Sequence, residues 1–340
     1  MKKVIAAIVL VVLAVVFASA GCKQKTEESA DTYRIAVIPK GTTHIFWKSI
    51  HAGAVKAAEE LKAAGVNVEI IWKGPLKEDD RESQIRVVED FVTRGVSGIV
   101  LAPLDDAALR MPVKDAVDND IPVVIIDSGL KSDDYTSFVA TDNYIGGTKG
   151  GERLAEILGG KGKVIMLRYQ EGSASTMNRE QGFLDILKEK YPDIEVVSAN
   201  QYGGATTESA YQSSENLLAP LRTADGKLTI DGIFCPNEST AFAMLRALED
   251  SDLAGKVTYV GFDSSDRLVM GLRSGKIQGL VLQDPINMGY LGVKTLMAHL
   301  QGQKVEKRID TGSAVATPEN MDDPKMKNLL EPDFKKWLNE

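Results

Sequence analysis

Two aromatic residues and a histidine stand together soon after the first apolar strand-like run of the sequence. The stretch is Thr43-His44-Ile45-Phe46-Trp47, and it opens an expected helix that ends near residue 64. An exposed Phe-Trp pair at a helix start is unfavourable in water unless something covers it. The pair therefore predicts half of a sandwich for a small ring-shaped ligand, and packing of Phe46 and Trp47 into the core is the alternative.

The elements that would position these residues follow a regular rhythm. Short β-branched runs alternate with amphipathic helical stretches from Tyr33 onward, which predicts parallel sheets covered by helices on both faces. The expected strands are 34–38, 66–72, 98–102, 122–126 and 138–141, and then 163–168, 194–199, 232–235, 257–262 and 278–283. Their number predicts an α/β fold with two doubly wound parallel-sheet lobes.

Polar side chains follow the carboxyl ends of these expected strands, which is the edge where open α/β sheets bind ligands. The candidate ligand-binding residues are Lys40, His44, Phe46, Trp47, Asp127, Thr141, Asn178, Asn237, Asp263 and Gln283. Carboxylates accept hydrogen bonds from hydroxyl groups, and amides both donate and accept them. The set therefore suits a ligand with several hydroxyls, and a helix N-cap is the alternative role for Asp263.

The chain begins with the features of a secretory signal. Basic residues precede an apolar run over 4–16 and a group of small residues, so we expect a signal peptide over 1–21. The apolar run is shorter than the roughly 20 residues that a membrane-spanning helix needs.

Cys22 directly follows the small residues, in the manner of a bacterial lipoprotein. We expect Cys22 to carry a lipid and residues 22–31 to form a flexible polar tether to the membrane. Ser19 stands where Leu is commonest in such signals, and ordinary cleavage after Ala20 is the alternative.

Composition argues against several classes of function. The formal net charge is −8, and Lys and Arg do not cluster, which argues against nucleic acid as a partner. The three histidines are scattered, and neither a nucleophile motif nor metal-ligand spacing occurs, so we expect no enzyme, no cofactor and no metal.

The glycines of 146–151 do not have phosphate-loop spacing and are expected to allow close helix packing. Cys235 lies in an apolar run and is expected to be a core thiol.

Several stretches together resemble the ribose- and galactose-type periplasmic binding proteins of ABC importers. They are 46–54 with its aromatic pair before Gly-Ala, 121–127, 139–147, 179–183 and 260–263, with Gln283 twenty positions later. The likeness spans nearly all of the mature chain and is more specific for fold than for ligand. It implies that Phe46 and Trp47 stack on the ligand ring. It also implies that the ring hydroxyls are bound by Asp127, Asn237, Asp263 and Gln283.

The sequence departs from the ribose-binding pattern at three places. Ala102 stands where an Asn is usual, Ser128 stands where an Arg is usual, and the region of Met177 and Asn178 does not preserve another sugar-binding Arg. These departures argue against ribose itself.

Lys40 before the aromatic pair, and Asp127 with Ser128, also look like the autoinducer-2 binding proteins of the same fold. In those proteins the lysine reaches the ligand. Lys40 would then serve a tetrahydroxylated furanose or a mildly acidic sugar, and a solvated lysine is the alternative.

The resemblance implies a monomeric receptor whose lobes close on one pentose, hexose or related polyol and deliver it to the permease subunits of an ABC importer. The expected lobes are 32–141 with 284–312, and 142–283 with 313–340. A sugar or autoinducer-2 sensor that signals to a chemoreceptor or histidine kinase is the alternative.

Overall fold

The computed structural model describes residues Thr32–Leu338. The expected signal peptide, Cys22 and the tether lie outside the described residues. Residues from Tyr33 onward form one compact unit.

The first lobe is built on a six-stranded parallel sheet. Its strands are β1 (Tyr33–Ile38), β2 (Val68–Trp72), β3 (Gly98–Leu101), β4 (Val123–Ile126), β5 (Ser137–Ala140) and β11 (Arg308–Asp310). They lie in the order β11-β5-β4-β3-β1-β2. Helices α2 (Ile45–Ala63) and α10 (Pro285–Leu300) cover one face, and α3 (Arg81–Thr93) and α4 (Arg110–Asp118) cover the other. Strands β3 and β4 are therefore apolar throughout.

The second lobe repeats this plan. Its strands are β6 (Gly162–Arg168), β7 (Ile194–Tyr202), β8 (Gly232–Phe234), β9 (Thr258–Phe262), β10 (Gly279–Leu282) and β12 (Ala314–Ala316). They lie in the order β12-β10-β9-β8-β6-β7, and only the pairing of β12 with β10 is antiparallel. One face carries α5 (Asn143–Ile157) and α6 (Ala174–Lys190), and the other carries α7 (Thr207–Leu218), α8 (Glu238–Asp250) and α9 (Asp266–Arg273). A 3-10 turn, η1 (Ala219–Leu221), follows α7.

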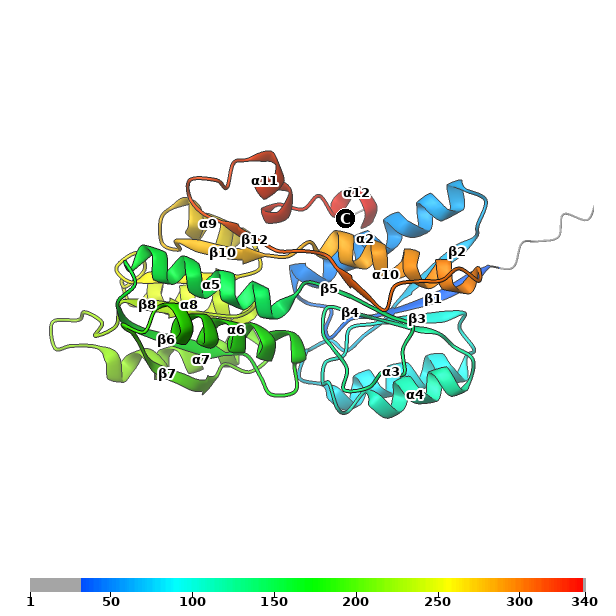
Figure 1. Cartoon of the computed structure of the whole chain (residues 1–340), viewed down its shortest axis with the longest axis horizontal. Coiled ribbons are helices and arrows are strands. Elements are labelled where there is room, and N and C mark those ends of the chain that lie inside the picture. Colours follow the sequence, from blue (N-terminus) through cyan, green and yellow to red (C-terminus); the bar gives the residue numbers. More distant parts are fainter. Residues whose placement is uncertain (1–31, 339–340) are drawn as a thin grey trace, which may run out of the picture. The chain divides into compact units, whose positions relative to one another are not determined.

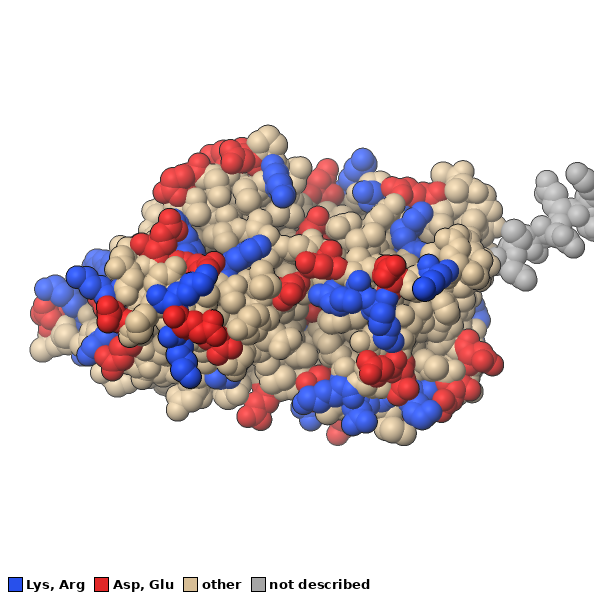
Figure 2. Space-filling view, viewed as in Figure 1, with Lys and Arg blue, Asp and Glu red and all other residues tan. Residues whose placement is uncertain are grey.

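The α/β fold with two parallel-sheet lobes is thus as predicted, and all ten expected strands are present. Strands β11 and β12 were not predicted, because three residues are too few to show an alternating pattern. Within Thr32–Leu338, none of the helices is long and apolar enough to cross a membrane. Acidic and basic side chains are interspersed over the face of the molecule shown in Figure 2.

The chain passes between the sheets at three neighbouring places: after β5, after β10, and between β11 and β12. Hydrogen bonds tie two of these crossings together. The Thr141 hydroxyl donates to the carbonyl oxygen of Gly312 at 3.0 Å, and the amide of Asp142 donates to Asp310 at 3.0 Å. These segments together form a hinge-like connection between the lobes.

The C-terminal segment departs from the expected lobe boundary. Helix α11 (Pro324–Leu330) packs on the second lobe, where Leu330 is buried and the Ser264 hydroxyl donates to the carbonyl oxygen of Leu329 at 3.3 Å. Helix α12 (Lys335–Leu338) then contacts α2 of the first lobe (Figure 1). The end of the chain therefore spans both lobes, and a helix of four residues is too short to reveal this in the sequence.

Paired glycines let helices approach closely in each lobe. A Cβ atom on Gly53 of α2 would lie 1.9 Å from the carbonyl oxygen of Ile286, and one on Gly289 of α10 would lie 2.0 Å from that of Ile50. In the second lobe, a Cβ atom on Gly147 of α5 would lie 2.0 Å from the carbonyl oxygen of Arg179. The glycine run within α5 therefore allows close packing, as predicted, with Gly147 and Gly151 against α6 and Gly146 and Gly150 against the sheet.

Replacing Gly147 by alanine should lower the free energy of unfolding by about 1–3 kcal/mol or more, because the added methyl group forces α5 and α6 apart. Gly129→Ala is the matched control, since its Cβ atom would meet nothing closer than 3.8 Å. Urea denaturation followed by circular dichroism measures both changes. Equal stability of the two variants would contradict the packing argument.

Candidate functional site

Asp127 and Asp263 occupy matching positions in the two lobes. Each directly follows the last residue of a central strand, β4 or β9. Their backbones are left-handed, with φ of 59° and 67°, a conformation that Asp adopts more readily than most residues. Both side chains are buried. The strand-end turns therefore fix one carboxylate from each lobe.

Arg179 of α6 lies between these two carboxylates and is 2% exposed. Its guanidinium nitrogens are 3.9 Å from an Asp127 oxygen and 3.6 Å from an Asp263 oxygen. The Nε atom donates to Asn143 at 2.8 Å, and the guanidinium lies 4.0 Å from the centre of the Phe262 ring. Burial raises the pKa of Asp263, and the charge of Arg179 opposes that shift. One cation thus compensates two buried acids.

Lys40 brings a second cation to Asp127, with 3.0 Å between Nζ and Oδ2. The ammonium also donates to the hydroxyls of Ser173 and Ser175 in the other lobe, at 3.2 and 3.1 Å. Lys40 is 3% exposed, so it is not the solvated lysine that was the alternative.

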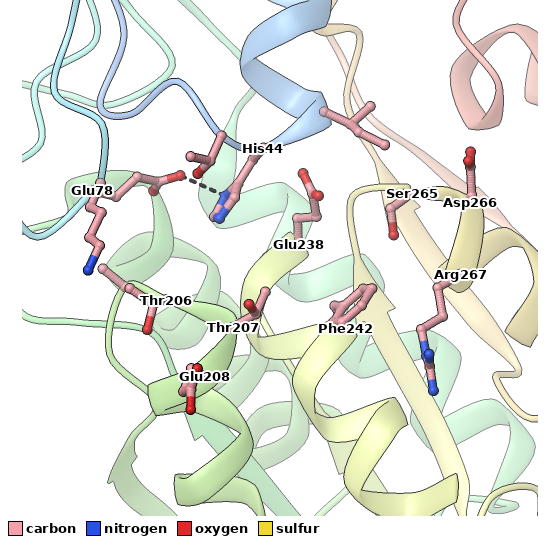
Figure 3. Close-up of a pocket in the computed structure, with 14 residues that line it drawn as sticks. His44, Glu78, Thr206, Thr207, Glu208, Glu238, Phe242, Ser265, Asp266 and Arg267 are labelled. Atoms are coloured by element: carbon pink, nitrogen blue, oxygen red, sulfur yellow. Dashed lines mark ion pairs between the residues drawn. The ribbon is translucent and has the colours of Figure 1, made fainter.

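His44 and Glu78 form the third charged pair, with 2.8 Å between Nδ1 and Oε1 (Figure 3). The Trp47 indole also donates to Glu78, at 2.7 Å, and the Tyr169 hydroxyl donates to it from the other lobe, at 2.5 Å. Burial disfavours the charged imidazole, but the hydrogen bond and charge of Glu78 outweigh it and raise the pKa of His44 to about 9. Burial likewise opposes ionisation of Glu78. The hydrogen bond and charge of His44, together with the hydrogen bonds from Tyr169 and Trp47, outweigh burial and lower the pKa of Glu78 to about 2.

Phe46 and Trp47 do not form a flat stack. Their ring centres are 5.0 Å apart and their planes cross at 85°. Trp47 is 3% exposed and belongs to the core between α2 and the first sheet, while Phe46 is only partly buried. Both rings nevertheless line the interlobe cavity. The two predicted roles, core packing and cavity wall, are therefore combined in one pair.

Gln283 and Asn237 differ in how many of their hydrogen-bonding atoms remain available to a ligand. Gln283 donates to Asp263 at 2.7 Å, and its Oε1 atom is buried without a hydrogen-bond partner in the described part of the chain. Asn237 caps α8 through Thr240 and donates to Ser239. Gln283 thus has an unused acceptor, whereas much of the Asn237 amide is already engaged.

Glu238, at the start of α8, accepts a hydrogen bond from the backbone amide of Phe46 in the other lobe, at 3.3 Å. It makes no ion pair with any described residue. Burial raises its pKa to about 7; the charge of His44 opposes this shift, and that of Asp263 adds to it. Glu238 is therefore the one cavity carboxylate, among those described, that lacks a cationic partner.

Residues of both lobes line a single cavity with these groups at its centre. The lining comprises Lys40, His44, Phe46, Trp47, Glu78, Asp127, Tyr169, Ser175, Thr176, Arg179, Asn237, Glu238, Asp263 and Gln283. The hollow between them is about 30 Å³, which is close to the volume of one water molecule. A larger ligand can enter only if the lobes and these side chains move apart.

Two predicted site residues lie outside the cavity lining. Thr141 is buried in the crossing between the lobes, where its hydroxyl bonds to Gly312. Asn178 is exposed on α6, and the next residue, Arg179, faces the cavity instead. Successive helix residues point about 100° apart, so a displacement of one position separates solvent from site.

Several other lining residues are not among the candidate ligand-binding residues. Tyr169 directly follows β6 and meets the same strand-end rule as Asp127. Arg179 lies within α6, where the strand-end rule does not apply, although it begins the stretch 179–183 that carries part of the resemblance. Glu78 comes from the connection between β2 and α3. The described residues contain no cluster of His, Cys, Asp and Glu suited to a metal ion.

Comparison with known proteins places this architecture among binding proteins. A family model described as a periplasmic binding protein domain matches residues 35–304. The ribose import binding protein of Haemophilus influenzae is 29% identical, over 91% of this chain and 97% of its own length. The D-ribose/D-allose-binding protein of Pseudomonas aeruginosa is 30% identical, over 86% and 89% respectively.

Solved structures agree with this placement. A carbohydrate transporter solute-binding protein from Agrobacterium radiobacter, in complex with D-arabinose, has a TM-score of 0.81 and 35% identity, covering 89% of this chain and 100% of its own. An ABC transporter solute-binding protein from Agrobacterium vitis, with bound D-fucose, has a TM-score of 0.80 and 36% identity, with coverages of 87% and 99%.

The His44–Glu78 pair predicts how stability depends on pH. His44 keeps its proton up to about pH 9 in the folded protein but only to its ordinary pKa of 6.5 when unfolded. The contribution of His44 to the free energy of unfolding is therefore complete below pH 6.5 and is lost as the pH rises through 9. Glu78→Gln should remove this decline, because its carboxylate is what raises the pKa of His44.

Chemical denaturation of both proteins from pH 6 to pH 9.5 measures the difference. Asp118→Asn, which removes an exposed ion pair to Lys114, should keep the native profile. The same decline in Glu78→Gln as in the native protein would show that the pair does not cause it.

Proposed function

This chain belongs to the periplasmic binding protein family, and from that premise we propose that its interlobe cavity captures one ring of a small neutral sugar for an ABC importer. The family and its relatives are substrate-binding proteins and not enzymes. Family membership places the protein in the periplasm, with a sugar as ligand and an ABC permease as partner.

The observation that carries the proposal is the placement of one buried carboxylate from each lobe around Arg179. Each acid retains oxygen lone pairs that can accept ligand hydroxyls, and Gln283 offers one further buried acceptor. Removing such a hydroxyl from the ligand leaves buried polar groups unpaired, which costs about 1–3 kcal/mol. Acceptors in both lobes favour a pentose, a hexose or a related polyol.

Charge balance favours a neutral ligand over a sugar acid. Lys40, Arg179 and His44 are each already paired with a carboxylate. A ligand carboxylate would have to displace one of these partners, and Glu238 would then repel it. A neutral sugar uses the existing pairs as fixed hydrogen-bonding groups.

Capture requires the lobes to part and close again. Hydrogen bonds hold the lobes together in this structure: Tyr169 donates to Glu78, and the backbone amide of Asp106 donates to the carbonyl oxygen of Gly172 at 2.9 Å. A ligand that touches both lobes adds contacts available only in the closed form and so favours that form. The cavity is completed within one chain, which supports a working monomer.

A thermal-shift screen of the mature domain tests the function. Neutral pentoses, hexoses and polyols are compared with sugar acids and autoinducer-2, since a ligand that binds only the folded protein raises the melting temperature with concentration. We expect a saturable rise with at least one neutral sugar. A rise confined to sugar acids, or none at all, would contradict the proposal.

Asp263→Asn should weaken binding of the best sugar about tenfold or more, because it removes a charged acceptor worth about 1.5–3 kcal/mol. Asn tolerates the left-handed backbone, so the fold should persist. Asp120→Asn is the matched control, since Asp120 has the same backbone conformation and is exposed. Calorimetric titration measures all three proteins, and unchanged affinity in Asp263→Asn would exclude that residue from the site.

We also propose that Cys22 anchors the protein by a lipid. Cys22→Ala in the full-length precursor should move the protein from the membrane fraction to the soluble periplasmic or secreted fraction without changing sugar affinity. Cys235→Ala is the control, because Cys235 is buried in the second lobe. Equal membrane association of native and Cys22→Ala proteins would contradict lipid anchoring.

A further inference from the structure

A second hollow lies directly outside the interlobe cavity, which we now call the sugar cavity. This second hollow also lies between the lobes and has a volume of about 830 Å³ (Figure 3). We call it the outer chamber. It is lined by Thr43, His44, Ile45, Lys77, Glu78, Ala205, Thr206, Thr207, Glu208, Glu238, Phe242, Ser265, Asp266 and Arg267. Of these, His44, Glu78 and Glu238 also line the sugar cavity, so the two spaces share a wall.

Phe242 gives the outer chamber an aromatic surface. It projects from α8 and is only partly buried. The guanidinium of Arg267 lies 5.4 Å from the centre of the Phe242 ring, and Glu249 holds Arg267 in an ion pair. The ring is therefore supported from its own lobe and remains available to the chamber.

Hydroxyl and carboxylate groups surround this ring. The side chain of Thr206 is fixed by reciprocal hydrogen bonds with Ser209, which places Thr207 and Glu208 at the chamber edge. Ser265 is 7% exposed, and its hydroxyl has no hydrogen-bond partner among the described residues. An aromatic face with nearby hydroxyls and carboxylates is a lining suited to a sugar ring.

We propose that the outer chamber is a second sugar subsite and that the ligand is a disaccharide or a similar glycoside. This inference rests on the proposed function. One ring occupies the sugar cavity, and the second ring lies against Phe242. Glu238 stands at the border of the two spaces, where either ring can use its carboxylate. Because both lobes line the chamber, the second ring also favours closure.

Calorimetric titration with matched ligands tests this. The probes are the monosaccharide that gives the largest thermal shift, its methyl glycoside, and neutral disaccharides that contain the same ring at either end. In the native protein, at least one disaccharide should bind about tenfold or more tightly than the monosaccharide. Phe242→Ala and Phe242→Leu should remove this advantage while changing monosaccharide affinity less than about twofold.

Met270→Ala, which truncates an exposed apolar side chain on the neighbouring α9, is the control and should keep the advantage. The subsite is overturned if the monosaccharide binds as tightly as every disaccharide, or if the Phe242 variants weaken both ligands equally. Those results would leave the proposed function standing. Absence of binding by any neutral sugar, of one ring or two, would overturn both proposals.

Discussion

The burial of Arg179 between Asp127 and Asp263 is the interaction on which the rest of the site depends. The two carboxylates come from different lobes and stand at the ends of central strands, so they would repel each other without a cation between them. Arg179 reaches that position because Gly147 allows α5 to pack closely against α6, the helix that carries the arginine. Helix packing, charge balance and the proposed recognition of a ligand are therefore linked through one side chain.

In the proposed function, the same arrangement couples ligand binding to movement of the lobes. Lys40 and Tyr169 each bond across the cleft, and the chain itself crosses between the lobes near Thr141, Gln283 and Gly312. Helix α12 adds a contact with α2 beyond those crossings. A ligand that replaces water between the acceptors of both lobes stabilises the closed form by the contacts it makes there.

The sequence predicted the fold and the strand-end acids because both follow from regular rules. Buried parallel strands are short apolar runs, and the residues after them, such as Asp127 and Asp263, must face the cleft. Arg179 and Glu78 were not predicted as cavity residues, because no comparable rule applies to residues inside a helix or in a long connection. The prediction of Asn178 was displaced by one residue from Arg179, and on a helix that displacement moves the side chain from the cavity to solvent. Trp47 shows that one side chain can belong to the core and line the cavity as well.

A crystal structure of the mature protein with its tightest neutral sugar would show which groups hold the ligand. We expect a sugar ring between the lobes, with hydroxyls within hydrogen-bond distance of Asp127 and Asp263 and with Arg179 still between the two carboxylates. A sugar bound elsewhere on the protein, or a ring contacting only one of the two aspartates while the lobes remain apart, would contradict this expectation.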